Sequence, residues 1–332
     1  MDLRVSGDST MSAPSSLRIG TRGSALARTQ TDQVAGRLRE AGVNVTVEVI
    51  STLGDRRDDL PVARLGGDGV FVRELEQALL DGRIDAAVHS LKDLPTAETP
   101  GLVLAAIPTR ATPFDAVVGR SAPSLGALRR GALVGTSSIR REAQLRAVRA
   151  DLEIVPLRGN VDSRLRRLDS GDFDAVILAA AGLERLGLAD RITEMLRPPA
   201  FWPAVSQGAL AIQTRADDEP SRHAVRVLDD GPTRAAVAAE RCMLAGLAGG
   251  CLAPIGGWAR IEMGDLVLGG RVFDVDAGPE GAPCPAAELR RPWSADHDGA
   301  PGMAESLGDA VAALLVEQGA NRLIERVRHT KA

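Results

Sequence analysis

The chain has 332 residues, of which 44% are hydrophobic and 25% charged, which is enough for two or three soluble globular domains. Aromatic residues amount to 2% and the net charge is -4, so we expect no nucleic-acid partner. No run approaches the roughly 20 apolar residues of a membrane span. Three cysteines without a CxxC pair indicate neither disulfides nor a zinc site, and we expect a metal-free protein in the reducing cytoplasm.

The N-terminal segment, residues 1–16, lacks the apolar run of a signal peptide and is predicted to be a disordered lead-in, with the start at Met1 or Met11 left open. Strand-like and helix-like runs then alternate, which predicts an α/β fold. The runs of the first half are strand 17–22, helix 24–42, strand 45–52, helix 71–82 and strand 84–90.

The same order of elements returns further along the chain, as strand 132–138, helix 139–150, strand 152–159, helix 160–171 and strand 173–182. Two pairs of segments align across the halves: GTRGS at 20–24 with GTSSI at 135–139, and DGRIDAAV at 81–88 with SGDFDAVI at 170–177. We interpret this pattern as two similar α/β lobes. The alternative is that the alternation of strands and helices common to α/β folds produces the same similarity by convergence.

Two segments are predicted to connect the lobes, 107–119 crossing into the second and 203–215 returning to the first, which gives a hinged clamshell. A third region begins with a helix near 232 that runs into a glycine-rich loop, and it continues as an antiparallel sheet, a loop over 277–302 and a closing helix over 306–327. The predicted limits are 17–110 with 204–226 for lobe 1, 111–203 for lobe 2 and 230–332 for the C-terminal domain.

Polar residues follow the predicted strands, at the carboxyl ends where open α/β sheets bind ligands. In GTSSIRR at 135–141, hydroxyl caps precede Arg140 and Arg141 in the first helical turn, where the helix dipole disfavours cations by about 0.3–1 kcal/mol. An anionic ligand bound there would make the two arginines favourable, because the N–H groups, the helix dipole and the guanidinium groups would all attract it. The alternative is two solvated arginines that pair with Glu142.

A second arginine group surrounds LRGN at 157–160, where Gly159 allows a close turn and Arg164 lies one helical turn on. We expect Arg166 and Arg167 to face solvent. Several planar guanidinium groups suit a ligand with many carboxylates better than a single phosphate, and no phosphate-binding motif accompanies them. Further arginines that we place at the cleft are Arg22, Arg158 and Arg185.

The segment HSLKDLP follows a strand and contains Lys92, one of only two lysines among 40 basic residues. A carboxylate beside a fixed ammonium, as at Asp93, stays ionised and can stabilise a cation or move a proton. The alternatives are a lysine kept by chance and an aspartate that only caps a turn. His89 is assigned to the strand, as a core residue.

Cys251 ends the glycine-rich loop LAGLAGGC, which indicates a flexible or closely approached backbone and an accessible sulfur. The alternative is a small buried hydrophobic residue, and this is our interpretation of Cys242 and Cys284.

Together these segments resemble the porphobilinogen deaminases, also called hydroxymethylbilane synthases. The matching segments, in the family's order from about 17 to 260, are IGTRGSALARTQ, GVFVRELEQALLDGRIDAAVHSLKDLP, VGTSSIRREAQL, LRGNVDSRL, AAAGLERLGL, PAVSQGALAI and GGCLAPIG. After 261 the resemblance is loose, and residues 1–16 have no counterpart.

The resemblance implies two lobes like those of a periplasmic binding protein, with mixed sheets, plus a small α+β C-terminal domain. It implies a monomer in which Cys251 holds a dipyrromethane cofactor through a thioether. Four molecules of porphobilinogen would be deaminated and condensed stepwise on this primer, and hydroxymethylbilane would then be released.

Position by position, the resemblance also implies roles, with Asp93 as the catalytic carboxylate. The residues that match cofactor-binding groups are Ser90, Lys92, Thr136, Ser138, Arg140 and Arg141. The residues that match substrate-binding groups are Arg22, Ser24, Arg158, Arg164, Arg185 and Gln207. One departure is GGDG, which puts Asp68 where the family often has lysine, and Arg64 or Arg73 could compensate.

The main rival to an enzyme is a two-lobed protein that binds a small anion without chemistry. It explains the lobes and the arginines but gives Cys251, Asp93 and the third domain no role. A protein that binds nucleic acid through its arginines is the second rival, and the acidic net charge argues against it.

Overall fold

The structure is a computed structural model, and it describes residues 16–51, 72–248, 253–276, 283–294 and 302–331. The predictions for residues 1–15, Arg64, Asp68 and Cys251 therefore lie outside the described residues.

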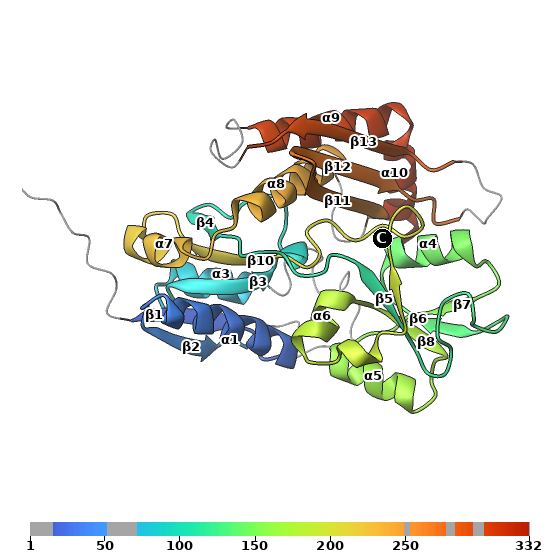
Figure 1. The fold of residues 1–332 in the computed structure, drawn as a ribbon, viewed down its shortest axis with the longest axis horizontal. Helices are drawn as coiled ribbons and strands as arrows, with labels where there is room; N and C mark the ends of the chain where they lie inside the picture. Colours follow the sequence, from blue (N-terminus) through green and yellow to red (C-terminus); the bar gives the residue numbers. More distant parts are fainter. Residues whose placement is uncertain (1–15, 52–71, 249–252, 277–282, 295–301, 332) are drawn as a thin grey trace, which may run out of the picture.

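Lobe 1 is built on a five-stranded sheet with the order β2-β1-β3-β10-β4, in which β1, β2 and β3 are parallel and β10 is antiparallel to both of its neighbours. Helices α1 and α7 pack on one face and α3 on the other (Figure 1). The elements are β1 (Leu17–Thr21), α1 (Ala25–Glu40), β2 (Val45–Val49), α3 (Arg73–Leu80), β3 (Ala86–Ser90), β4 (Leu102–Ala106), β10 (Leu210–Arg215) and α7 (Glu219–Arg226).

Lobe 2 has a sheet of the same design, with the order β7-β6-β8-β5-β9 and with β5 antiparallel to both neighbours. Leu145 of α4 packs on one face and Leu165 and Leu183 on the other. The elements are β5 (Asp115–Gly119), β6 (Leu133–Gly135), α4 (Ile139–Val148), β7 (Glu153–Val155), α5 (Val161–Asp169), β8 (Ala175–Ala179), α6 (Ala180–Arg185), a short 3-10 turn (Ala189–Arg191) and β9 (Glu194–Leu196).

The repeat predicted from sequence has a physical basis in the aspartate that precedes the third strand of each lobe. The Asp85 carboxylate accepts the backbone N–H of Arg18 at 2.9 Å, and the Asp174 carboxylate accepts that of Leu133 at 2.9 Å. Each aspartate also donates its own backbone N–H to the same residue, at 2.8 Å in both lobes. The aligned sequences thus occupy equivalent places in two sheets of one topology.

The third region packs α8, α9 and α10 against a three-stranded antiparallel sheet, β11-β12-β13 (Figure 1). Trp202 joins it to lobe 2, because a Cβ added at Gly256 or Gly269 would lie 2.6 or 2.5 Å from the Trp202 side chain. The elements are α8 (Gly231–Gly246), β11 (Ile255–Glu262), β12 (Asp265–Val272), β13 (Ala286–Pro292), α9 (Met303–Glu317) and α10 (Ala320–Lys331).

Several predicted elements need correction. The expected strand over 173–182 ends at Ala179, where α6 begins, and the expected strand over 203–215 begins only at Leu210. The single closing helix is two helices, because Gly319 adopts φ +90° between them. Strand β13 lies in a stretch predicted to be loop, and β4 and α7 were not predicted. The residue limits of the three domains stay predictions.

Candidate functional site

The end of β3 carries the first candidate residues, on the 3-10 turn Leu91–Asp93. The Lys92 ammonium donates a hydrogen bond to Oε1 of Gln207 at 3.1 Å, from lobe 1 to the segment that returns from lobe 2. The pKa of Lys92 is lowered to about 8, mainly by burial; Arg140 and Arg141 contribute to the lowering, and the charges of Asp93 and Asp115 oppose it. Lys92 therefore lies among charges from both lobes.

The N-terminus of α4 brings the second group of candidates to the same place. Thr136 Oγ1 accepts the Ser138 N–H at 3.2 Å, and Ser138 Oγ accepts the Arg141 N–H at 3.4 Å. Ser138 thus caps the helix and satisfies an N–H group that has no partner inside it, while Thr136 holds the cap residue in place. The capping fixes the first turn, which carries Arg140 and Arg141.

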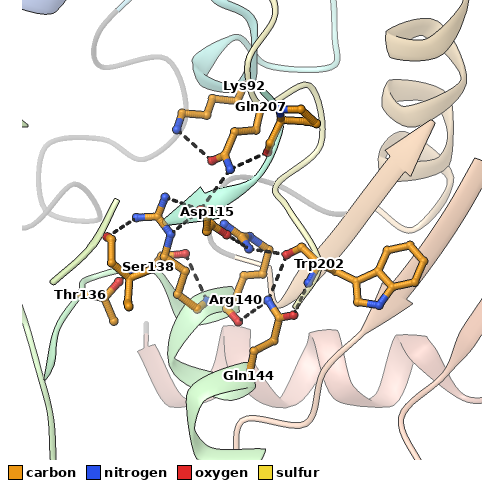
Figure 2. Close-up of polar contacts among 11 residues, drawn as sticks. Lys92, Asp115, Thr136, Ser138, Arg140, Gln144, Trp202 and Gln207 are labelled. Carbon is orange, nitrogen blue, oxygen red and sulfur yellow. Dashed lines mark hydrogen bonds and ion pairs between the residues drawn. The ribbon is translucent and has the colours of Figure 1, made fainter. Parts of the chain in front are cut away.

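Both arginines are buried, at 4% and 6% exposure, and Asp115 at the start of β5 forms ion pairs with both. Figure 2 shows Asp115 beside Arg140. Nη1 of Arg140 donates to Asp115 Oδ2 at 2.7 Å, while Nε and Nη2 of Arg141 donate to Oδ1 at 2.9 and 2.7 Å. Arg140 also donates to the Trp202 carbonyl, and Arg141 to the Ile177 carbonyl. The alternative that these are solvated arginines is wrong.

Gln207 connects this network to lobe 1. Its Nε2 donates to Asp115 Oδ1 at 3.0 Å and to the Pro113 carbonyl at 2.8 Å, while its Oε1 accepts from Lys92 (Figure 2). The turn that carries it is constrained, since Ser206 has φ 61° and a Cβ on Gly208 would lie 2.5 Å from the Ala111 carbonyl oxygen. Glycine is therefore required at the position after Gln207.

A buried ion pair holds the two inter-lobe segments to the third region. Arg110 of the first segment lies 2.6 Å from Glu240 of α8, and Glu240 also accepts backbone N–H groups from Ser206 and Ala259. Arg110 Nε donates to the Gln207 carbonyl at 2.8 Å. The fully buried Glu240 carboxylate thus fixes both connections between the lobes.

The arginines after β7 complete the site. Gly159 adopts φ +97°, and its carbonyl accepts from Nε of Arg164 at 2.8 Å. The pKa of Arg164 is lowered to about 10, mainly by burial and also by the charges of Arg141 and Arg158, while Asp93 acts in the opposite direction. The charge of Asp93 in lobe 1 therefore acts on an arginine of lobe 2.

This arrangement suits a ligand with several carboxylates. Five basic groups act on one another here, Lys92, Arg140, Arg141, Arg158 and Arg164, and Asp93 and Asp115 are the acids that act on Lys92 or Arg164. Positive charge is thus in excess in a partly buried place, where a polyanion is stabilised by charge-assisted hydrogen bonds.

Comparison with known proteins identifies the family. Residues 17–223 match the model described as porphobilinogen deaminase, dipyromethane cofactor binding domain, and residues 234–281 match the C-terminal domain of the same enzyme. The chain belongs to the porphobilinogen deaminase family. Curated members named porphobilinogen deaminase include those of Mycobacterium marinum, 50% identical over 93% of this chain and 96% of theirs, and of Syntrophobacter fumaroxidans, 44% identical over 94% and 97%.

Among solved structures, the methionine-binding protein MetQ aligns with 64% of this chain and 89% of its own, at 17% identity and a TM-score of 0.43. The helices in the described parts of the chain include none that is long and apolar enough to cross a membrane.

The resemblance to porphobilinogen deaminases predicted fourteen site residues, and the structure brings half of them into direct or electrostatic contact. These are Lys92, Asp93, Arg140, Arg141, Arg158, Arg164 and Gln207. Ser138 supports them as the cap of α4, and Thr136 accepts the Ser138 N–H. Ser24 caps α1, and Ser90 exchanges hydrogen bonds with Gln30. The roles of all these residues stay predictions.

The two remaining arginine candidates have other neighbours. The charge of Arg22 reaches His89, whose pKa burial lowers to about 4. Nη2 of Arg185 donates to the Gly208 carbonyl at 2.7 Å, and the residue lines a cavity of about 590 Å³ with α1 and residues 108–111. His89 is 5% exposed, so its assignment to the core is confirmed.

Sequence reasoning missed Asp115, Arg110 and Glu240. The sequence did contain a signal for Asp115: the helix dipole disfavours two arginines in a first helical turn, which indicates that a negatively charged group lies beside them. The interpretation of Cys242 and Cys284 as buried is also wrong, since both are half-buried. Cys242 donates to Asp309 at 3.1 Å, and burial raises the pKa of its thiol to about 12.

Proposed function

We propose that the protein catalyses the stepwise condensation of four porphobilinogen molecules on a dipyrromethane primer joined to Cys251, with Asp93 as the catalytic carboxylate. The observation that carries this proposal is the position of Asp93, on lobe 1 and within electrostatic reach of the Arg164 guanidinium on lobe 2. One carboxylate faces a basic cluster, as the chemistry of acidic pyrroles requires.

The residues present fit the cofactor. Its pyrroles carry acetate and propionate arms, and the excess positive charge around Lys92 and Arg164 matches them. The groups that would hold it are Ser90, Lys92, Thr136, Ser138, Arg140 and Arg141. When bound, the cofactor supplies the pyrrole carbon to which the next ring is joined.

Asp93 would act on the substrate. Loss of ammonia from porphobilinogen leaves positive charge on the pyrrole, and an ionised carboxylate near the ring nitrogen stabilises that charge. Asp93 in turn favours the ammonium form of Lys92 beside it. Half-burial of both side chains reduces screening by water and strengthens their effect.

Substrate carboxylates would bind the arginines around the cofactor cluster. Arg164 is one of these groups, since the charge of Asp93 acts on it, and Arg158 in turn acts on Arg164. Arg22, Ser24, Arg185 and Gln207 complete the set that we assign to incoming or growing pyrroles.

Intact mass tests the proposal. The purified wild-type protein should exceed its sequence mass by two linked pyrrole units, and Cys251→Ser should have the sequence mass and no turnover of porphobilinogen. Cys242→Ser is the matched control, because Cys242 is half-buried and should keep the extra mass. Wild-type protein at its sequence mass without turnover would support the anion-binding rival instead.

We also propose that the enzyme works as a monomer in the cytoplasm, as the family resemblance implies. Light scattering after size exclusion should give about the 34.8 kDa of one chain. A mass near twice that value would contradict the monomer.

A further inference from the structure

The Asp115 carboxylate accepts four hydrogen bonds although water does not reach it. The donors are Nη1 of Arg140, Nε and Nη2 of Arg141, and Nε2 of Gln207, at 2.7 to 3.0 Å. Asp115 has 0% exposure. A buried ionised group is tolerated only with such a full set of partners.

Opposite charge keeps Asp115 ionised. Burial alone would raise the pKa of its carboxyl, but the charges of Arg140 and Arg141 outweigh burial and hold that pKa well below its usual range. One negative charge then faces two positive charges. The remaining positive charge is available to an anion that enters the site.

The same contacts orient the two guanidinium groups. Arg141 is held on two sides, by Asp115 through Nε and Nη2 and by the Ile177 carbonyl through Nη1. Arg140 uses Nη1 for both Asp115 and the Trp202 carbonyl. Among the described residues, no protein atom is hydrogen-bonded to Nε or Nη2 of Arg140, and that planar edge matches one carboxylate.

Asp115 also lies where both lobes meet. Gln207 joins its carboxylate to the Lys92 ammonium, and Lys92 is the neighbour of Asp93 in the chain. The carboxylate that orients the arginines of lobe 2 is therefore connected, through one amide, to the turn that carries the reactive carboxylate of lobe 1.

We propose that Asp115 is a positioning residue for the condensation reaction. It orients Arg140 and Arg141 toward the carboxylate arms of the primer and, through Gln207, sets their place relative to Lys92 and Asp93. This inference rests on the proposed function. Because Asp115 has 0% exposure, it would act only through the arginines and Gln207.

A matched pair of variants separates positioning from simple stabilisation. Asp115→Asn removes the charge beside Arg140 and Arg141, and Asp85→Asn removes a carboxylate that also binds two arginines, Arg18 and Arg215, at the other end of β3. Both variants should unfold at lower temperature than the wild type. Holoprotein fraction by intact mass, kcat and KM are then measured for each, beside the wild type.

For Asp115→Asn we expect slow cofactor assembly and a fall in kcat of roughly 100-fold in the holoprotein, with KM for porphobilinogen within about threefold, because misplaced groups cost rate. Asp85→Asn should keep wild-type kcat. Equal loss in both variants, or wild-type kcat in holoprotein Asp115→Asn, would overturn the proposal. Since wild-type turnover is measured alongside, failure of the proposed function is recognised separately.

Asp115→Glu serves if Asp115→Asn does not fold. It keeps the charge but moves the carboxylate by one methylene. If Asp115 served only as a counter-ion, this variant would preserve its role. Positioning predicts that kcat still falls by roughly tenfold or more in folded holoprotein. Wild-type kcat in Asp115→Glu would show that charge is sufficient and would overturn the proposal.

Discussion

The two lobes share one sheet topology but carry different charged residues at the candidate site. In both, the loop after the first strand leads into a helix capped by a serine, Ser24 in lobe 1 and Ser138 in lobe 2. After the third strand they differ: lobe 1 continues into the polar turn Leu91–Asp93, and lobe 2 into the helix α6, whose first four residues are buried.

The helices after the first strands differ as well. In lobe 2, α4 begins with two buried arginines countered by Asp115, the first residue of β5. In lobe 1, the equivalent strand β10 begins with the apolar Leu210. One scaffold thus carries Asp93 in one copy and the buried arginines in the other, and under the proposed function the two lobes differ through residues at loop ends.

The lobe 1 contribution should have the largest effect. Asp93→Asn should reduce kcat by roughly 10²–10³-fold, because one positioned group stabilises the developing charge. Cofactor content by intact mass should stay normal. The control Asp81→Asn removes an exposed carboxylate from the same lobe and should leave kcat unchanged. Near-wild-type turnover by Asp93→Asn would contradict the proposal that lobe 1 supplies the catalytic carboxylate.

The lobe 2 contribution is tested by Arg141→Gln, which should purify largely as apoprotein. Loss of a charge-assisted hydrogen bond weakens binding by about 1.5–3 kcal/mol. Intact mass gives the holoprotein fraction, and Arg146→Gln, an exposed change on the same helix, should match the wild type. A fully loaded Arg141→Gln would show that the lobe 2 arginines do not hold the cofactor.

A third difference concerns acid stability. His89 occupies the place in β3 that Leu178 occupies in β8, and burial lowers its pKa to about 4 from 6.5. Between those values the unfolded chain binds a proton that the folded chain does not, so stability falls as pH falls below 6.5. Between pH 7 and 5 the loss should be about 2 kcal/mol.

His89→Leu, which copies lobe 2, should flatten that part of the curve of unfolding free energy against pH. The exposed His223 offers the control, since His223→Gln should keep the wild-type slope. An unchanged slope in His89→Leu would mean that the acid sensitivity has another source.

The smallest effect is expected for substrate binding by α5. Arg164→Gln should raise KM for porphobilinogen about tenfold through loss of one charged hydrogen bond. Arg166→Gln, an exposed change on the same helix, should leave KM within about twofold. If both variants behave alike, Arg164 does not bind substrate.

The sequence predicted that Lys92, Asp93, Arg140 and Arg141 lie near strand ends and gather in one place, because capping residues, glycines and charged residues lie next to one another in the chain. Their roles stay predictions. Asp115 could not be found in that way. It precedes its arginine partners by 25 and 26 residues, so only the folded sheet brings them together. Glu240 lies 130 residues from Arg110 and was hidden in an ordinary helical pattern for the same reason.

The predicted ends of strands and helices were wrong where the local sequence pattern did not indicate an end. The apolar run after Ala175 continues past the end of β8 into α6, and only the pairing with β5 limits the strand. Gly319 does break a helix, but the predicted closing helix ran straight through it.

The central claim is that a tethered primer grows beside one carboxylate between unlike lobes. Intact mass of the holoprotein after mixing with limiting porphobilinogen tests it most directly. We predict a series of masses above the starting holoprotein, separated by one pyrrole unit, for the wild type, and only the starting holoprotein mass for Asp93→Asn. The same series in both proteins, or no series in the wild type, would contradict the account.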